Sequence, residues 1–214
     1  MHPDDDLPAV IATTRRDIDT VAALAAQATR EHPLVTWLIP KAERRTGILH
    51  AWWAPQVRDC LHERGHVDLL ADHSAAAIWL DRTRPELFDY QRNLAAFGPH
   101  ADAAALLAQV LAVHRPATAH QHLAVLAVTP TRARRGRAKA LLEHPHRHLD
   151  RSGIYAYLEA GLDDRLASYT ALGYTPGAPF HTPAGPAILP MLRAPRNGHR
   201  VTALDEPFWP PHLT

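Results

Sequence analysis

The stretch of chain that most constrains the fold is residues 123–142, LAVLAVTPTRARRGRAKALL. It begins with a continuous apolar run that ends at Thr129 and Pro130, continues through a turn crowded with arginines, and resumes as a helical pattern. A continuous apolar run is typical of a strand that is buried on both faces. The stretch therefore predicts a buried strand, a turn and a helix, with the N terminus of the helix directly after the turn.

The turn between this strand and this helix carries the chemistry that a phosphate group needs. The first N–H groups of a helix have no partners within the helix, and the helix dipole adds partial positive charge there. Such a site favours an anion, and arginines at 132, 134, 135 and 137 strengthen the positive charge. The sequence therefore predicts a phosphate-binding turn; the alternative is a basic turn that only faces solvent.

The rest of the chain alternates helical and strand patterns without an internal repeat. Apolar residues at steps of three and four predict helices over 17–32, 41–64, 86–97, 101–114, 136–150 and 162–172. Apolar and β-prone runs predict strands over 10–14, 66–71, 75–80, 121–128 and 154–159, and a hairpin over 174–193. We therefore predict the fold class α/β (α+β), with one mixed domain over 9–193. A disordered acidic segment, 1–8, precedes it, and a Pro-rich tail, 194–214, follows it.

Composition excludes several classes of function. The 214 residues carry 23 basic and 22 acidic side chains, and this net charge of +1 gives no global basis for binding nucleic acid. The single cysteine, Cys60, excludes an intramolecular disulfide, and the acidic start lacks the pattern of a secretory signal. No continuous apolar run reaches the roughly 18–20 residues of a membrane span. We therefore expect a cytoplasmic monomer or homodimer that binds neither membranes nor nucleic acid.

Three segments resemble, in order and spacing, a known enzyme family. The first is VTP at 128–130 followed by the basic turn, a glycine, a second small residue and a Leu-Leu pair; the others are YLE at 157–159 and SYTALGY at 168–174. They look like the acetyl-CoA-binding segment, the fifth strand and the "FYERLGF" segment of the GCN5-related N-acetyltransferases. HRP at 114–116 and AAIW at 76–79, with the AYLEA strand, resemble the puromycin N-acetyltransferase group of that family.

The resemblance implies a particular sheet. This sheet is mixed, mostly antiparallel and built of about six or seven strands. It has a splay between its fourth and fifth strands and is flanked by helices. We expect the splay to position the reacting groups.

The resemblance also implies where acetyl-CoA would bind. The backbone of Leu126, Ala127 and Val128 would pair with the pantetheine arm and donate an N–H to the thioester carbonyl, which is oxyanion-type stabilisation. The phosphates and the rest of the arm would lie against Ala133, Arg134, Arg135, Gly136, Arg137, Ala138, Lys139, Arg165 and Ser168. Four positions depart from the family pattern: Ala133 replaces Gln or Arg, Ala138 replaces Gly, Arg165 replaces Asn and Ser168 replaces Phe. Alanine is frequent at the second of these, so we expect the other three to weaken cofactor binding.

Acyl transfer from a thioester to an amine needs a neutral amine and a protonated leaving thiolate. Tyr169 stands at the family's general-acid position and is the candidate proton donor, with an ordinary pKa of about 10. The candidate bases are His122, which alternation places on the same strand face as Leu126, and Glu159 at the end of its strand. Each has a structural alternative: a packed helix tyrosine, a buried strand histidine and a carboxylate that holds the splay open.

Two tryptophans are candidates for the acceptor site. They are Trp37, in a predicted loop between helices, and Trp79, in the predicted hairpin at 66–80; Trp52 and Trp53 instead fit the buried stripe of their helix. Histidines at 144, 146 and 148 do not predict a metal site, because a spacing of two points side chains to different faces of a helix. We expect no metal ion.

These features together predict an N-acetyltransferase. It would move an acetyl group from acetyl-CoA to the amine of a small molecule, of the antibiotic or secondary-metabolite type, in a ternary complex; antibiotic resistance is the corresponding role. The alternatives are a non-catalytic acyl-CoA sensor or partner protein, and an acyltransferase for a peptide or protein amine. A DNA-contacting helix over 131–142 is disfavoured, because an apolar strand precedes it and no second helix lies in helix-turn-helix register.

Overall fold

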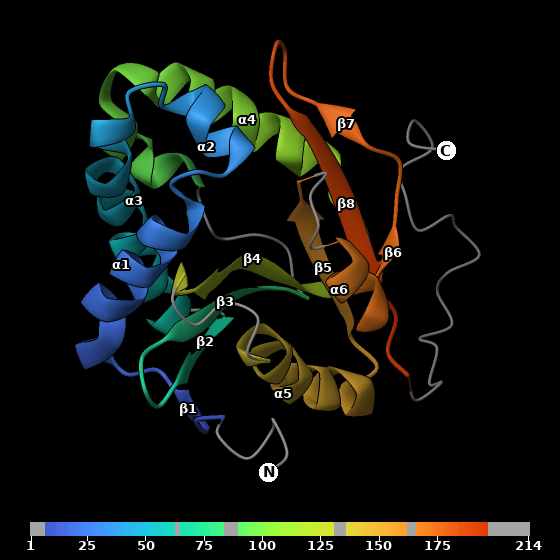
Figure 1. Cartoon of the computed structure of the whole chain (residues 1–214). Helices are drawn as coiled ribbons and strands as arrows, with labels where there is room; N and C mark the ends of the chain where they lie inside the picture. The colour runs from blue at the N-terminus through green and yellow to red at the C-terminus, as the bar shows by residue number, and fades with distance from the viewer. Residues whose placement is uncertain (1–6, 63–64, 84–89, 131–135, 162–165, 197–214) are drawn as a thin grey trace.

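The computed structural model describes the backbone of residues 7–62, 65–83, 90–130, 136–161 and 166–196 (Figure 1). Its strands are β1 (Val10–Ala12), β2 (Gly65–Leu70), β3 (Ala75–Arg82), β4 (His120–Val128), β5 (Tyr155–Ala160), β6 (Thr175–Pro176), β7 (Phe180–His181) and β8 (Ala187–Arg193). They form one sheet in the order β1-β2-β3-β4-β5-β8-β6, with β7 paired to β8. All neighbours are antiparallel except β4 and β5, which are parallel. This confirms the predicted mixed fold, with eight strands because the last predicted hairpin forms three.

Helices lie on both sides of this sheet (Figure 1). They are η1 (Arg15–Asp17), α1 (Ile18–Thr29), α2 (Pro33–Leu38), α3 (Ala42–His62), η2 (Tyr90–His100), α4 (Ala101–Val113), α5 (Arg137–Ser152) and α6 (Leu166–Ala171). The sequence pattern predicts a helix that ends before Pro33 and does not predict the short helix α2. Instead Pro33 begins one: proline suits the first helical position, and the His32 ring caps the helix by accepting from the Leu34 N–H.

The parallel strands β4 and β5 run side by side for only part of their length. Only His120, Gln121 and His122 of β4 pair with β5, opposite Tyr155–Tyr157. Beyond this point β4 continues along β3, and β5 continues along β8 on its other edge. The two strands therefore separate in the middle of the sheet, which confirms the predicted splay between the fourth and fifth strands.

A bulge in β4 changes which side chains share a face. Ile78 pairs with Val125 and Trp79 with Leu123, so Ala124 is an extra residue on β4. His122 therefore lies on the same face as Val125, whereas Leu126 lies on the opposite face with Leu123. The prediction that His122 and Leu126 share a face is wrong, because strict alternation does not hold across a bulge.

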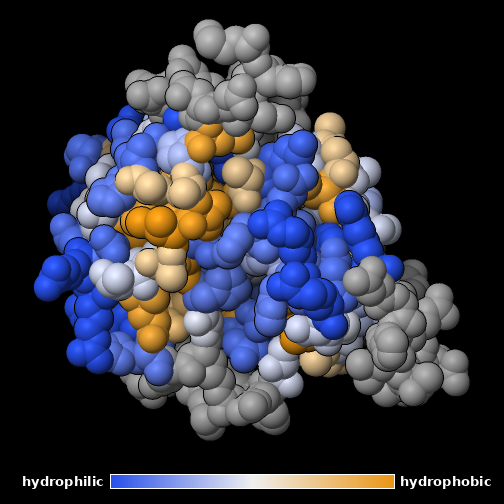
Figure 2. Space-filling view, turned by 90° about the horizontal axis from the view of Figure 1, so that it is seen from below, coloured by the Kyte–Doolittle hydropathy of each residue, from blue (hydrophilic) through white to orange (hydrophobic). Residues whose placement is uncertain are grey.

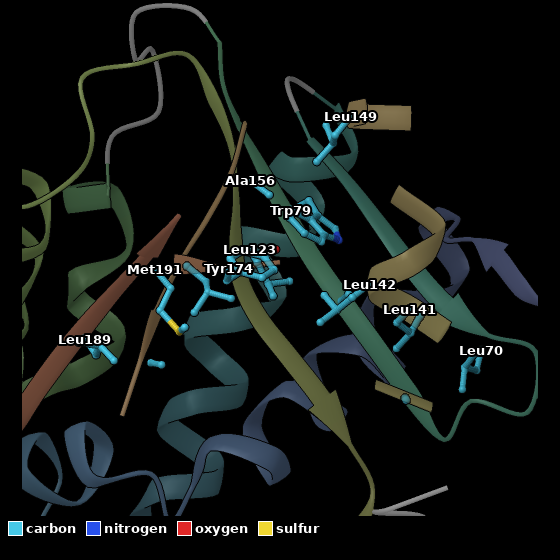
Figure 3. Packing of buried hydrophobic residues seen from close by; sticks show 14 residues of the cluster. Leu70, Trp79, Leu123, Leu141, Leu142, Leu149, Ala156, Tyr174, Leu189 and Met191 are labelled. Atoms are coloured by element: carbon cyan, nitrogen blue, oxygen red, sulfur yellow. The ribbon is translucent and has the colours of Figure 1, made fainter. Parts of the chain in front are cut away.

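Two apolar clusters hold the helices to the two faces of the sheet. On one face α1 and α3 pack on β2, β3 and β4 through residues such as Val21, Val57 and Ile78. On the other face α5 places Leu141, Leu142 and Leu149 against a cluster that includes Trp79, Leu123, Tyr174 and Met191 (Figure 3). The outer face of α5 is polar, and hydrophilic residues cover much of this side of the molecule, with hydrophobic residues between them (Figure 2).

One helical segment among the described residues, Asn93–Val113, is long and apolar enough to cross a membrane by length and composition, with a mean hydropathy of 1.3. The segment is not one continuous α-helix. Gly98, with φ of 52°, and Pro99 kink it, and its first part is the 3₁₀ helix η2. The helix predicted over 86–97 is thus helical from Tyr90 on, and residues 86–89 lie outside the described residues. The regular helix α4 has 13 residues, about 20 Å, which is shorter than the roughly 30 Å hydrocarbon core.

A buried carboxylate lies between β2 and α5. The Asp68 side chain lies 3.6 Å from the His66 ring and 3.6 Å from the His144 ring, and the residue is 5% exposed. Burial raises the pKa of Asp68 to about 6, although the neighbouring His144 acts to lower it. The folded chain thus holds the proton of the Asp68 carboxyl group more tightly than the unfolded chain does. The stability that Asp68 contributes is therefore present below about pH 4 and is lost as the pH rises through 6.

We expect Asp68→Asn to remove this pH dependence, because the amide cannot ionise. At pH 8 the variant should have a free energy of unfolding about 1–3 kcal/mol higher than the wild type, measured by urea denaturation. At pH 4 the two proteins should differ little. A difference that is the same at both pH values would contradict the buried, proton-holding role of Asp68.

Candidate active site

A cavity of about 260 Å³ lies where β4 and β5 separate. Its walls come from the α1–α2 link, α2, α3, η2, α4, four consecutive residues of β4 after His122, the end of β5, and α6. Because the cavity reaches the opening between the two strands, it contacts residues from both faces of β4. Its lining combines helices from one side of the sheet with Tyr169 of α6.

His122 and Glu159 form a pair at the fork between the strands. His122 Nε2 lies 2.6 Å from Glu159 Oε2, and both side chains line the cavity. An ionised carboxylate only accepts hydrogen bonds, so Nε2 carries a hydrogen, and in the neutral imidazole Nδ1 then carries the lone pair. Nδ1 is buried and has no hydrogen-bond partner among the described residues. The pair therefore presents the arrangement of a general base whose ring is oriented by a carboxylate.

Charges around Glu159 keep it ionised although it is buried. Burial acts to raise its pKa, but the hydrogen bond from His122, the charge that His122 carries when protonated, the charge of Arg115 and the nearby Tyr157 hydroxyl together hold the pKa below its ordinary value. Tyr157 packs edge-on against His120, with ring centroids 5.3 Å apart, and burial lowers the pKa of His120 to about 3. Glu159 is thus a carboxylate at neutral pH, able to stabilise an imidazolium at His122.

Tyr169 lines the same cavity from α6. Its ring packs edge-on against Tyr174, with centroids 5.9 Å apart, and it rests on the apolar cluster beneath α5. The main-chain carbonyl of Tyr169 accepts the N–H groups of Leu172 and Tyr174, which fixes the end of α6. The structure thus brings all three predicted catalytic residues, Tyr169, His122 and Glu159, to one cavity.

The N terminus of α5 lies on the other side of the splay from α1 and α3. Gly136 is its N-cap with φ of 72°, a left-handed conformation that favours glycine, and no described side chain caps the first turn. The first N–H groups of α5 therefore remain available to an anion. The end of β4 leads toward this turn. Its residues Leu126 and Val128 face the α5 side, and Ala127 faces α1 and α3.

The predicted cofactor-binding side chains differ in what they contact. Arg137 is 5% exposed and donates to Ser74 Oγ at 2.8 Å and to Asp72 Oδ2 at 3.1 Å, so its guanidinium joins α5 to the β2–β3 turn. Lys139 is exposed and lies 3.8 Å from Glu143. The side chain of Ala138 is partly buried and that of Ser168 is exposed. Four other predicted positions lie outside the described residues, namely Ala133, Arg134, Arg135 and Arg165.

The tryptophans are distributed differently from the prediction. Trp79 is fully buried beneath α5 and does not line the cavity, so its predicted substrate contact is wrong (Figure 3). Trp37 lies in α2 rather than in a loop and packs on the cluster around Phe97, outside the cavity lining. Trp52 and Trp53, predicted as core, do line the cavity, because the buried stripe of α3 faces it as well as the sheet.

The sequence pattern does not identify the helical walls of this cavity. Residues at positions 104, 107, 108 and 111 of α4 face it, together with Phe97 of η2 and Val35 of α2. The spacing of three and four along α4 was a usable signal, but this helix is apolar almost all round, so its pattern does not show which stripe faces a ligand.

Two other chemistries find little support among the described residues. Their His, Cys, Asp and Glu side chains form no group of three or more that could hold a metal ion. Cys60 is buried, lies 3.1 Å from the Trp79 carbonyl oxygen, and burial raises its pKa to about 12. A thiol in this state is a poor nucleophile, so it offers no acyl-enzyme intermediate.

No family model matches the sequence. Among solved structures, the chain is similar to a Corynebacterium glutamicum protein named "histone acetyltransferase HPA2 and related acetyltransferase", at 20% identity and a TM-score of 0.63, over 88% of this chain and 97% of that one. It is also similar to the ribosomal-protein-S18-alanine N-acetyltransferase of Escherichia coli, at 16% identity and a TM-score of 0.54, over 88% of this chain and 94% of that one. A GCN5-related N-acetyltransferase of Rhodopseudomonas palustris aligns at 12% identity and a TM-score of 0.53, over 88% of this chain and 96% of that one. The chain therefore has the fold of the GCN5-related N-acetyltransferases, as its motifs predicted.

We expect Arg137→Ala to destabilise the protein. The substitution leaves Ser74 and Asp72 without their buried partner and should lower the free energy of unfolding by about 1–3 kcal/mol in urea denaturation. Lys139→Ala, two residues along the same helix, is the matched control and should stay within about 0.5 kcal/mol of the wild type. Equal stability of the two variants would contradict the structural role of Arg137.

Proposed function

We propose that the protein is an N-acetyltransferase that moves an acetyl group from acetyl-CoA to the amine of a small molecule, by direct attack in a ternary complex. The observation that carries the proposal is that a candidate base, His122 with Glu159, and a candidate acid, Tyr169, line one cavity at the strand splay. Acid–base groups on the two sides of one reaction site are what amide formation from a thioester requires. The fold supports the same assignment.

The features around α5 and β4 fit acetyl-CoA, which when bound supplies the acetyl thioester. The first turn of α5, which no described side chain caps and which follows the left-handed Gly136, fits a pyrophosphate through N–H groups of residues 137–139. On β4, the stretch Leu126–Val128 has no strand paired along its β5 side in the described structure, so its backbone can bind an extended arm. The Arg137 side chain is already engaged, so this residue contributes its backbone N–H.

The pair at the fork takes the proton that the amine loses. As the amine nitrogen attacks the carbonyl carbon, a new C–N bond forms and the C–S bond breaks. His122 Nδ1 accepts the proton, directly or through a water, and the carboxylate of Glu159 stabilises the resulting imidazolium through Nε2. In apolar surroundings this charge compensation is worth more than it would be in water.

Tyr169 supplies the proton that the departing sulfur needs. Its phenol lines the cavity on the opposite side of the splay from the helices α1 and α3. A phenol has an ordinary pKa of about 10, which suits proton donation to an alkyl thiolate. One proton leaves the amine and one reaches the sulfur, so the products are a neutral amide and a thiol.

Two alternatives remain to be tested by experiment. A non-catalytic acyl-CoA sensor would bind acetyl-CoA and release no thiol with any amine. A protein or peptide acceptor has a precedent in the fold, since the similar Escherichia coli enzyme is named for an alanine of a ribosomal protein. A thiol-release assay with acetyl-CoA and a panel of small amines and peptides separates all three. The assignment to the puromycin-like group, with its role in antibiotic resistance, rests on the sequence resemblance.

We expect Tyr169→Phe to lower kcat by about 10- to 100-fold while the dissociation constant for coenzyme A stays within about twofold. The reason is that the variant keeps the ring and its packing on Tyr174 and loses only the proton donor. Tyr155→Phe, outside the cavity lining, is the control and should keep full turnover. Full turnover in Tyr169→Phe would remove the general-acid assignment.

We expect His122→Asn to lower kcat/KM by about 100-fold or more, and Glu159→Gln by about 10-fold or more. The glutamine still accepts a hydrogen bond from Nε2 but carries no charge, so it holds the ring without stabilising an imidazolium. If the two residues act as one unit, the double variant should be no slower than His122→Asn alone. Effects that multiply in the double variant would show that the pair does not act together.

A further inference from the structure

The cavity at the splay has an uneven distribution of polar groups. Only five of its described lining residues carry a hydroxyl, imidazole or carboxyl group, and they are Thr29, His32, His122, Glu159 and Tyr169. Two of the five are used by their own helices: Thr29 donates to the Ala25 carbonyl, and His32 caps α2. The remaining three are the groups assigned to the reaction.

The rest of the described wall is apolar. It is formed by the side chains of Leu34, Val35, Leu38, Leu49, Trp52, Trp53, Leu94, Phe97, Ala104, Leu107, Ala108 and Leu111, with carbon atoms of β4 and β5. Trp52 and Phe97 are in contact, with ring centroids 5.0 Å apart, so two helices close the wall with aromatic rings. The described lining contains no Lys or Arg, and Glu159 is its single acidic side chain. The carboxylate of Glu159 already bonds His122.

From this wall we infer that the acceptor is an apolar primary amine, an alkylamine or arylalkylamine with no second charged group; the inference rests on the proposed function. A carboxylate, phosphate or second ammonium in the cavity would lose its hydration without meeting an opposite charge, which costs several kcal/mol. An apolar chain or ring instead gains free energy for each methylene that it buries. The amine end lies at His122 and the apolar part against α3, η2 and α4.

The size of the cavity narrows the acceptor further. A volume of about 260 Å³ is just below the usual range of small-ligand pockets, roughly 300–1,000 Å³. It suits a single ring or a short chain. A peptide would bring backbone N–H and C=O groups that need partners, and the indole N–H groups of Trp52 and Trp53 are the only polar side-chain groups of the described apolar wall. The structure therefore favours a small amine over a protein acceptor.

The apolar wall also contributes to the chemistry. Burial away from water disfavours the ammonium form and lowers the pKa of an amine. An amine seated against these side chains therefore loses its proton more easily, which is the form that attacks the carbonyl carbon. Binding energy from the apolar part of the acceptor is in this way used to prepare the nucleophile.

The test is a thiol-release assay with acetyl-CoA and two matched series of amines. The first series is the n-alkylamines from propylamine to heptylamine with 2-phenylethylamine; the second is ω-amino acids and α,ω-diamines of the same lengths. We expect kcat/KM to rise about fourfold per methylene in the first series until the chain fills the cavity. The second series should be at least about 100-fold poorer. A flat length dependence, or equal turnover of the ω-amino acids, would overturn the inference.

Neighbouring residues of α4 give a matched pair of variants. Leu107 lines the cavity, whereas Leu106 is 38% exposed and does not. Leu107→Gln should reduce the gain per methylene and the preference over ω-amino acids, and Leu106→Gln should leave both unchanged. An unchanged preference in Leu107→Gln, in protein shown to be folded by circular dichroism, would place the acceptor elsewhere.

Binding measured without acetyl-CoA separates this inference from the proposed function. The shift in Tm that each amine causes reports occupancy of the cavity alone. Stabilisation by apolar amines with no acetylation of any of them would overturn the proposed function and retain the cavity assignment. Acetylation that prefers the charged series, with no stabilisation by alkylamines, would overturn the cavity assignment and retain the acetyltransferase.

Discussion

The separation of β4 from β5 is the constraint on which the rest of this structure depends. A parallel pair of strands normally continues its hydrogen-bond ladder, but here the ladder ends after His122 and Tyr157. Glu159 lies two residues beyond Tyr157, on the same face of β5, and bonds His122 at 2.6 Å. A side-chain hydrogen bond thus bridges the strands where the backbone bonds stop, and both of its side chains line the cavity.

That bridge places a charge in the interior, and its surroundings show how the charge is tolerated. Burial acts to raise the pKa of Glu159, and His122, the positive charge of Arg115 and Tyr157 oppose this effect. Replacing this network by apolar side chains would fill the fork at no electrostatic cost. Its presence beside a cavity that is otherwise apolar therefore fits a reaction that moves a proton better than it fits packing alone.

The two faces of the sheet carry different parts of the candidate site. On one side, α1 to α4 enclose an apolar space; on the other, α5 begins after Gly136 with a first turn that no side chain in the described part of the chain caps. The arginines of the turn were predicted to act together on phosphate, yet Arg137 serves packing, joined to Asp72 and Ser74. The near-neutral chain therefore uses one of its clustered positive charges to fix the helix whose backbone would bind the anion.

Local sequence determined the order of the elements, because helical and strand periodicity, proline, glycine and capping residues act within a few positions of the chain. It also placed the strand, turn and helix of 123–142, and the resemblance of its motifs to the N-acetyltransferases made Tyr169, His122 and Glu159 candidates. The tertiary structure alone decided that His122 and Glu159 form a pair. It also showed that Ala124 forms a bulge, that Trp79 is core and that Trp52 and Trp53 line the cavity. These facts depend on register and packing between segments far apart in the chain. The periodicity within one segment does not show which distant segment packs against it.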